Sequence, residues 1–302
     1  MDQHIEAYLQ YCAAMKLSKA SINNYSRALT FFADHLASHD RSLTSAQPRD
    51  VTDFMTAHAD WDAATTANRL SALRGFYKWA QIRGILDGEN PMLEIRSPKQ
   101  HQKRNKPTVT QDEVHLLLET QRIHRDGTAL PTDLRDRCII ALIYDTGIRV
   151  AEVASLNVGH IQSMDAEKRE FVYVGKGGSE YTWYVTPDVY EMLLRYINTL
   201  DTPEPEQPLF CNRGGQRLSI RYIQKILADR GKNVLGRHLH PHMLRRGFGN
   251  AFYAASGNDI YATSQALHHA SVTTTQGYLA VGQDNLKKIM DGMSAKRTSA
   301  SP

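Results

Sequence analysis

The segment "HMLRR" holds the pair of residues whose types and spacing are most suited to chemistry. His242 and Arg245 are three positions apart, so they share one face if the segment is helical, as Pro241 at the first helical position favours. That face would offer a proton carrier beside a guanidinium able to hold two oxygens of an oxyanion. The pair therefore predicts a proton carrier and an oxyanion clamp on one helical face.

Three further segments hold candidates that are weak when taken singly. Arg149 in "YDTGIRVAEVASL" follows a glycine that ends a helix, although an ordinary surface arginine is the commoner explanation. Lys176 lies in "GKGG", between two runs typical of strands, where lysines are usually only solvated. Tyr278 follows His269 by nine residues, and a histidine in such a place more often forms hydrogen bonds within a core.

Several other classes of site are disfavoured. "GKGG" is no phosphate-binding P-loop, because no Lys-Ser or Lys-Thr pair follows it at the start of a helix. The histidines of "RHLHPHMLRR" have no Asp, Glu or Cys at ligand spacing, so we expect no metal and no cofactor. Cys12, Cys138 and Cys211 are isolated from one another, which favours buried thiols over a zinc motif or a disulfide framework.

Length and charge indicate two domains and a polyanionic partner. A chain of 302 residues is longer than one core usually supports. The net charge of +4 is modest, but five Lys or Arg and no acid lie in 96–106, and nine Lys or Arg with one acid lie in 209–249. Such clusters favour a phosphate-binding surface, most simply nucleic acid. Without a basic, apolar leader or a long apolar run, we expect a cytoplasmic protein that uses no membrane.

The elements expected to position these residues are mainly helical. Residues 1–95 predict a four-helix unit, with one helix capped by Ser18 and another that follows Asp62 and stops near Gly84. Three basic residues of the last helix are candidates to face DNA: Arg69, Arg74 and Lys78. A proline-rich, basic stretch then reads as a linker. After it, a capping box of Thr110 and Glu113, a buried helix to about Asp145, and a β-hairpin around "GKGG" are expected.

Taken in order, the candidates form a pattern that is specific as a set. The chain has Tyr-x-Thr-Gly-x-Arg-x-x-Glu, a Gly-Lys-Gly hairpin, His-x-x-Arg, and a histidine followed nine residues later by tyrosine. This resembles the tyrosine recombinase (phage integrase) family, particularly its Xer-like members, over nearly the whole chain. The resemblance implies a mainly α fold with a small β-hairpin, in which a helical SAM-like core-binding domain and a catalytic domain form a two-domain DNA clamp.

The resemblance also implies boundaries and catalytic positions. The expected parts are a core-binding domain (1–95), a basic linker (96–107), a catalytic domain (108–283) and a C-terminal helix and tail (284–302). In the family, two arginines hold the scissile phosphate, the hairpin lysine protonates the leaving 5′ oxygen, two histidines assist, and a tyrosine is the nucleophile. The matching positions are Arg149, Lys176, His242, Arg245, His269 and Tyr278.

The chemistry of a phosphodiester agrees with those roles. Its negative charge repels attack, and two arginines can offset the charge of the transition state without a metal. A phenol, with a pKa of about 10, needs a proton acceptor such as His242. The 3′-phosphotyrosyl ester conserves the energy of the broken bond, so resealing needs no ATP. A type IB topoisomerase-like or telomere-resolving enzyme shares this set of residues, and an inactive DNA-binding regulator of the same descent is a third hypothesis.

Two positions depart from the family pattern, and several features bear on partners. Leu267-His268-His269 stands where Leu-Gly-His is common, so His268 could alter local packing or add a DNA contact; Arg246 stands where many relatives have histidine. The resemblance implies double-stranded DNA with specific sites as the partner, bound by a homotetramer on two duplexes, with accessory DNA-bending proteins as a further option. The remaining candidates for DNA contact are Lys103, Arg104, Lys106 and Arg246.

Overall fold

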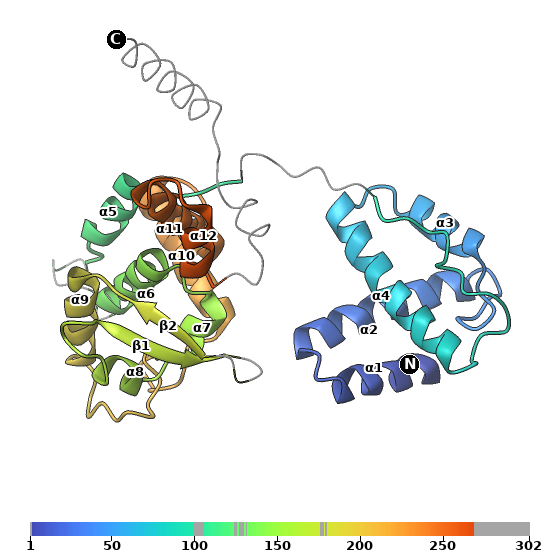
Figure 1. Cartoon of the computed structure of the whole chain (residues 1–302), viewed down its shortest axis with the longest axis horizontal. Coiled ribbons are helices and arrows are strands. Elements are labelled where there is room, and N and C mark those ends of the chain that lie inside the picture. Colours follow the sequence, from blue (N-terminus) through green and yellow to red (C-terminus); the bar gives the residue numbers. More distant parts are fainter. Residues whose placement is uncertain are drawn as a thin grey trace, which may run out of the picture. The chain divides into compact units, whose positions relative to one another are not determined.

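The computed structural model describes residues 2–98, 106–123, 126, 130, 132–175, 178 and 180–268. Its contacts divide the chain into two compact units, with the division between residues 102 and 103 (Figure 1). Each unit has a hydrophobic core of its own. The prediction of a mainly helical fold with a small antiparallel sheet is confirmed.

The first unit contains four helices: α1 (Gln3–Ala14), α2 (Lys19–Ala37), α3 (Pro48–Ala57) and α4 (Ala63–Ile82). Side chains of Asp2, Ser18 and Asp62 cap α1, α2 and α4 by accepting hydrogen bonds from first-turn amides, which replaces partners that a helix start lacks. The side chains of Leu70, Leu73, Phe76, Tyr77 and Ala80 form the buried stripe of α4. The predicted Ser18 cap and the stop before Gly84 are both confirmed.

The basic side chains of α4 differ from one another in their surroundings. Lys78 is exposed. Arg74 is half-buried and donates to the carbonyl of Ile95 at 3.0 Å. The Arg69 guanidinium lies 5.6 Å and 5.5 Å from the ring centres of Phe31 and Trp61, a cation–π arrangement. Arg69 and Arg74 therefore also contribute to the packing of the first unit, which their place on a polar face did not indicate.

The second unit is built around α6 (Asp133–Thr146), whose residues from Cys138 to Ile143 are all buried. It is contacted by α5 (Gln111–Glu119), α7 (Val150–Ser155), α9 (Pro187–Ile197), α10 (Ile220–Leu235) and α11 (Pro241–Ala255). The remaining helices are α8 (Val158–Gln162) and α12 (Ile260–Ala266). The capping box of Thr110 and Glu113 is confirmed. An apolar helix surrounded on several sides is the expected centre of a helical domain.

The predicted β-hairpin is confirmed. Strands β1 (Glu170–Val174) and β2 (Glu180–Tyr184) pair antiparallel, with Phe171 opposite Trp183 and Val172 opposite Thr182. Because side chains alternate along a strand, Phe171 and Trp183 face the core and are buried, whereas Val172 and Tyr184 lie on the other face and are exposed. Between the two strands, Gly178 has a φ of +80°.

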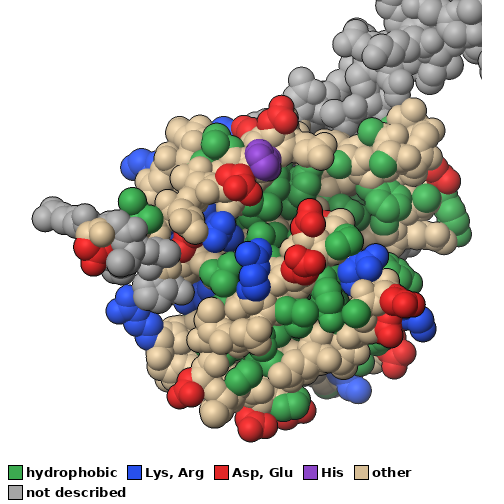
Figure 2. All heavy atoms as spheres, turned by 90° about the vertical axis from the view of Figure 1, so that its left-hand side faces the viewer, with side chains coloured by type: hydrophobic (Ala, Val, Ile, Leu, Met, Phe, Trp, Pro, Cys, Tyr) green, Lys and Arg blue, Asp and Glu red, His purple; other side chains and the backbone are tan. Residues whose placement is uncertain are grey.

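Much of the positive charge between 209 and 249 is used inside the unit. Arg230 is buried and donates to Asp133 at 2.7 Å and to the carbonyl of Leu117 at 2.6 Å. Arg237 pairs with Glu113 at 2.7 Å, and Arg217 donates to the carbonyl of Leu156 at 2.8 Å. The expectation that this whole cluster is a phosphate-binding surface was therefore too broad. On the face of the second unit in Figure 2, acidic and basic side chains are interspersed.

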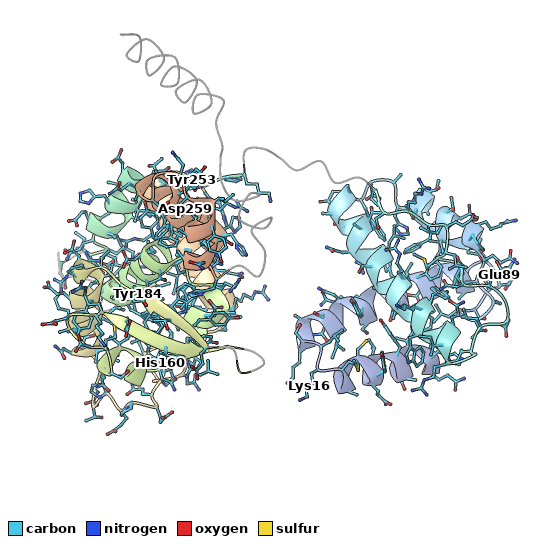
Figure 3. The ribbon with its side chains drawn as sticks, viewed as in Figure 1. Lys16, Glu89, His160, Tyr184, Tyr253 and Asp259 are labelled. Atoms are coloured by element: carbon cyan, nitrogen blue, oxygen red, sulfur yellow. The ribbon has the colours of Figure 1, made fainter. Side chains whose placement is uncertain are left out.

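Local capping fixes the elements around the candidate site. Asp259 begins α12 by accepting from the amides of Tyr261 and Ala262, and His160 of α8 lies beside β1 with its ring centre 6.4 Å from that of Tyr173 (Figure 3). Over the described part of the chain, no helix combines the length and the apolarity needed to cross a bilayer.

Candidate functional site

Arg149 is held at the turn between α6 and α7. Gly147 ends α6 with a φ of +68°, in the left-handed region that glycine adopts without strain. The backbone amide of Arg149 donates to Glu152 Oε2 at 2.8 Å, and its Nη1 donates to Glu152 Oε1 at 3.1 Å. With 41% of its side chain exposed, Arg149 presents a guanidinium that one carboxylate orients and solvent still reaches.

Arg245 lies deeper, on α11, and is 2% exposed. Its Nη1 donates to the carbonyl of Gly147 and its Nη2 donates to the carbonyl of Leu267 at 2.5 Å. On the same helix, a Cβ at Gly249 would lie 3.3 Å from Leu267 Cδ1, so the glycine leaves room for the Leu267 side chain. The guanidinium thus connects the end of α6 to the residue after α12.

The two arginines meet at consecutive carbonyls. Arg149 Nη2 donates to the carbonyl of His268 at 3.3 Å, next to the Leu267 carbonyl that Arg245 holds. The bond from Arg245 to Gly147 joins residues 98 positions apart, and the bond from Arg149 to His268 joins residues 119 positions apart. Two cationic, planar side chains at one place are suited to binding the non-bridging oxygens of a phosphate.

His242 lies one helical turn before Arg245. The residue is exposed to solvent, yet desolvation by the surrounding protein lowers its pKa, and the cationic Arg246, Arg245 and Arg149 lower the pKa further. A histidine with a lowered pKa is neutral at neutral pH and has a free ring nitrogen. It can therefore accept a proton beside the two arginines.

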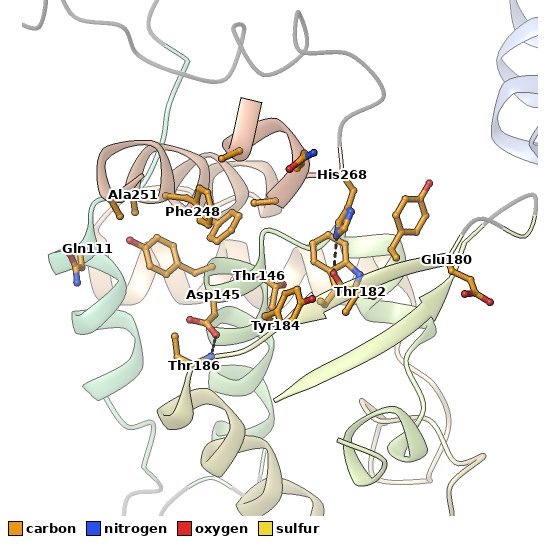
Figure 4. Close-up of a pocket in the computed structure, with 18 residues that line it drawn as sticks. Gln111, Asp145, Thr146, Glu180, Thr182, Tyr184, Thr186, Phe248, Ala251 and His268 are labelled. Atoms are coloured by element: carbon orange, nitrogen blue, oxygen red, sulfur yellow. Dashed lines mark hydrogen bonds between the residues drawn. The ribbon is translucent and has the colours of Figure 1, made fainter. Parts of the chain in front are cut away.

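His268 links this site to the hairpin. Its backbone has a φ of +47°, and its ring is half-buried. Nε2 lies 3.1 Å from the carbonyl of Thr182, and the ring centre lies 4.2 Å from that of Trp183 at 83° and 5.1 Å from that of Tyr181 (Figure 4). Burial lowers the pKa of His268, so at neutral pH the ring is uncharged, with the hydrogen on Nε2, since a carbonyl only accepts.

An open hollow of about 890 Å³ adjoins His268. Apolar side chains of α11 and α12, including Phe248, Phe252 and Ala262, form one wall, and β2 forms another (Figure 4). At the end of α6, Asp145 accepts from the amide of Thr186 at 2.6 Å. Sequence patterns did not predict this bond. It ties the chain just after β2 to the end of α6 and so helps to position the hairpin.

The structure brings together Arg149, His242 and Arg245 from the predicted set, with Glu152 supporting the first. Lys176, His269 and Tyr278 lie outside the described residues, as do Lys103 and Arg104. Of the other candidates for DNA contact, Lys106 is exposed, and Arg246 is half-buried and donates to the carbonyl of Pro107 at 2.9 Å. Among the described residues, no three His, Cys, Asp or Glu side chains form a cluster suited to a metal ion.

Two family models match the chain, one over each unit. Residues 107–284 match the model of the phage integrase family, and residues 5–84 match the model of the phage integrase N-terminal SAM-like domain. The chain belongs to the phage integrase family. It is a site-specific tyrosine recombinase.

Curated relatives of this phage integrase chain cover nearly its whole length. Tyrosine recombinase XerC of Chromobacterium violaceum is 30% identical over 295 residues, 97% of this chain and 94% of the relative. Tyrosine recombinase XerC of Neisseria meningitidis serogroup C is 31% identical over 297 residues, 95% of this chain and 94% of the relative. These similarities extend across both units.

Solved structures confirm the fold of this family member. The XerH site-specific recombinase bound to palindromic difH substrate, in its post-cleavage complex, has a TM-score of 0.72 at 22% identity, covering 89% of this chain and 78% of that one. A lambda integrase (75–356) dimer bound to a COC′ core site has a TM-score of 0.67 at 13% identity, covering 90% and 95%.

Proposed function

We propose that this recombinase cuts and rejoins specific sites in double-stranded DNA through Tyr278, with Arg149 and Arg245 holding the scissile phosphate. The observation that carries the proposal is the meeting of both guanidiniums at the consecutive carbonyls of Leu267 and His268, with His242 beside them. The order of the family pattern along the chain adds Lys176, His269 and Tyr278.

In the proposed cleavage step, the Tyr278 oxygen attacks phosphorus, and a phosphorus–oxygen bond to tyrosine forms as the bond to the 5′ oxygen breaks. The phenolic proton passes to neutral His242, and Lys176 supplies a proton to the leaving 5′ oxygen. The products are a 3′-phosphotyrosyl ester and a 5′ hydroxyl. A 5′ hydroxyl from another strand reverses the step, returns the proton and restores the phosphodiester, so no external energy is required.

The arginines would contribute charge that is already in place. Negative charge on the non-bridging oxygens increases in the transition state, and fixed cations stabilise it without reorganisation. Glu152 keeps the Arg149 guanidinium directed at the site by a contact of 3.1 Å. His269 would donate to the same phosphate. The lowered pKa of His242 supports its role as the acceptor at neutral pH.

The proposal extends to partners. Several solved neighbours are recombinases bound to DNA, which supports duplex DNA as the substrate. Family resemblance supports a homotetramer on two duplexes, with residues 284–302 joining protomers, and accessory DNA-bending proteins as an option. In addition to the clamp, Lys78, Lys103, Arg104, Lys106 and Arg246 would contact DNA phosphates, and Arg69 and Arg74 of α4 are further candidates.

The test is covalent trapping. Sites would first be found by mapping protein–DNA adducts in DNA flanking the encoding gene. On a substrate nicked next to the scissile phosphate, the cleaved strand diffuses away and the adduct persists. We expect wild-type protein to form it, Tyr278→Phe to form none, and Tyr261→Phe, which changes an exposed tyrosine, to match wild type. An adduct with Tyr278→Phe would refute the assignment, and site-independent relaxation of supercoiled DNA would indicate a topoisomerase instead.

A further inference from the structure

One residue, His268, contacts both the arginine clamp, through its backbone, and the hairpin, through its side chain. His268 gives its carbonyl to Arg149 at 3.3 Å, while its ring contacts three consecutive residues of β2: a hydrogen bond to Thr182 and edge-to-face contacts with Tyr181 and Trp183. The hydrogen bond joins residues 86 positions apart. A single residue therefore spans two elements that come from distant parts of the chain.

The backbone of His268 makes this contact costly. A φ of +47° lies in the left-handed region, which is unfavourable for a residue that has a Cβ. The family's usual glycine would avoid that cost and would place no ring against β2. In this chain the ring contacts offset the strain, because each aromatic pair and the hydrogen bond are favourable in a half-buried setting. A strained residue held by specific contacts next to a site favours a functional role.

We propose that His268 is a positioning residue that joins strand β2 of the hairpin to the arginine clamp and thereby supports protonation of the leaving oxygen by Lys176. This inference rests on the proposed function, because it takes Lys176 as the group that protonates the leaving oxygen. The described strand β2 begins at Glu180, four residues after Lys176. Thr182 and Trp183 are thus close in sequence to Lys176, so the contacts that fix this strand bear on the proton transfer proposed for that lysine.

A defect in the general acid differs measurably from a defect in the clamp. An alkoxide leaving group needs a proton in the transition state. A thiolate leaves without one, because the pKa of a thiol is only about 8.5. Replacing the bridging 5′ oxygen by sulfur should therefore rescue variants that misplace Lys176. Variants that weaken the arginines should stay slow on both substrates, because the charge on the non-bridging oxygens is unchanged.

The experiment measures single-turnover cleavage of nicked substrates with a 5′-bridging oxygen or sulfur, together with the Kd for the same DNA. We expect His268→Gly to bind DNA like wild type, to cleave the oxygen substrate about tenfold more slowly, and to recover to within about threefold on sulfur. Lys176→Ala should behave similarly, and Arg149→Ala should be slow on both. Thr202→Gly, which changes another residue of positive φ in the same unit, is the matched control and should match wild type on both.

His268→Asn provides a second variant, because asparagine tolerates the left-handed region yet lacks the imidazole. Both variants cleaving the oxygen substrate at the wild-type rate, or both being equally slow on the two substrates, would overturn the inference. If instead wild-type protein itself gave no Tyr278-dependent adduct, the proposed function would fail first. The two failures are thus distinguishable in one set of reactions.

Discussion

The two arginines of the clamp have different structural surroundings despite their shared proposed role. Arg245 is 2% exposed and satisfies two backbone carbonyls. Arg149 is 41% exposed at its side chain and pairs with Glu152. Removing a partner from buried carbonyls leaves them unsatisfied, whereas an exposed ion pair contributes little to stability. Substitutions at the two positions should therefore separate stability from catalysis.

We expect Arg245→Ala to lower the free energy of unfolding of the second unit by about 2 to 5 kcal/mol, and Arg149→Ala to lower it by less than about 1 kcal/mol. Both should slow cleavage by about 100-fold or more, since each removes a cation from the transition state. The measurement is urea unfolding followed by Trp183 fluorescence in a background where Trp61 and Trp79 are phenylalanine, because Trp183 is then the sole tryptophan. Equal loss of stability in both variants would contradict the structural distinction.

At the scale of residues, sequence patterns could supply the types but not the contacts. The pattern His-x-x-Arg predicted that two side chains share a helical face, and Gly-x-Arg predicted an arginine at the turn after a helix. Both predictions were possible because helix spacing and turn chemistry are local. The carbonyls of Leu267 and His268 could not be predicted as partners of the arginines, since every residue has a carbonyl. The departure from glycine at position 268 was visible in the sequence. Its bond to Thr182 was not, because it depends on a backbone φ and on distant strands.

At the scale of elements, the junction between α6 and α7 does most to place the clamp. Gly147 reverses the chain with a left-handed φ, its carbonyl accepts from Arg245, and the side chain two residues on is Arg149. A Cβ on Gly147 would lie 2.5 Å from Phe248 Cδ1 and 3.0 Å from Leu267 Cδ2. The junction thus needs glycine for conformation and for space together.

Gly147→Ala should therefore destabilise the second unit more than Gly236→Ala does. Gly236 has a similar φ of +66° with nothing within 4 Å of an added Cβ, so its substitution costs only the left-handed strain of about 1 kcal/mol. The overlap at Gly147 adds about 1 to 3 kcal/mol and should also slow cleavage, because Phe248 and Leu267 must move beside Arg245. Denaturant unfolding and single-turnover cleavage of both variants test this. Similar values for the two would show that space at Gly147 is not limiting.

Element prediction worked where a cap or a buried stripe is present. Ser18, Thr110 and Pro241 mark helix starts that the structure confirms. The short α8 and α12 were not predicted individually, because five and seven residues carry too little periodicity to be distinguished from turns. Charge runs were the least informative signal, since internal bonds of Arg217, Arg230 and Arg237 depend on tertiary packing.

At the scale of the molecule, each unit has its own core and its own share of basic residues. On α4 of the first unit, Lys78 is exposed while Arg74 is bonded to the Ile95 carbonyl. A solvated lysine that meets a DNA phosphate releases condensed counterions, whereas an arginine already bonded within the protein contributes to folding. Lys78 and Arg74, one helical turn apart, are therefore expected to affect different properties: Lys78 the affinity for DNA and Arg74 the stability of the first unit.

We expect Lys78→Ala to reduce the slope of log affinity against log salt by about 1, with unchanged unfolding of the first unit. Arg74→Ala should lower the stability of that unit, because the Ile95 carbonyl loses its donor. The measurement is fluorescence anisotropy of a fixed labelled duplex at several salt concentrations, with denaturant unfolding of the same proteins. An unchanged salt slope for Lys78→Ala would remove this residue from the proposed DNA-binding surface.

The burial of Arg245 also bears on how other sequences of this fold should be interpreted. A lineage that lost strand exchange but kept the folded domain would still be under selection to retain Arg245, because two carbonyls inside the domain depend on its guanidinium. The exposed Arg149 would not be under that constraint, so it could be substituted without loss of the fold. Loss of the residue aligned with Arg149 should consequently be the earlier mark of an inactive descendant, and the presence of Arg245 alone should not be taken as a sign of activity.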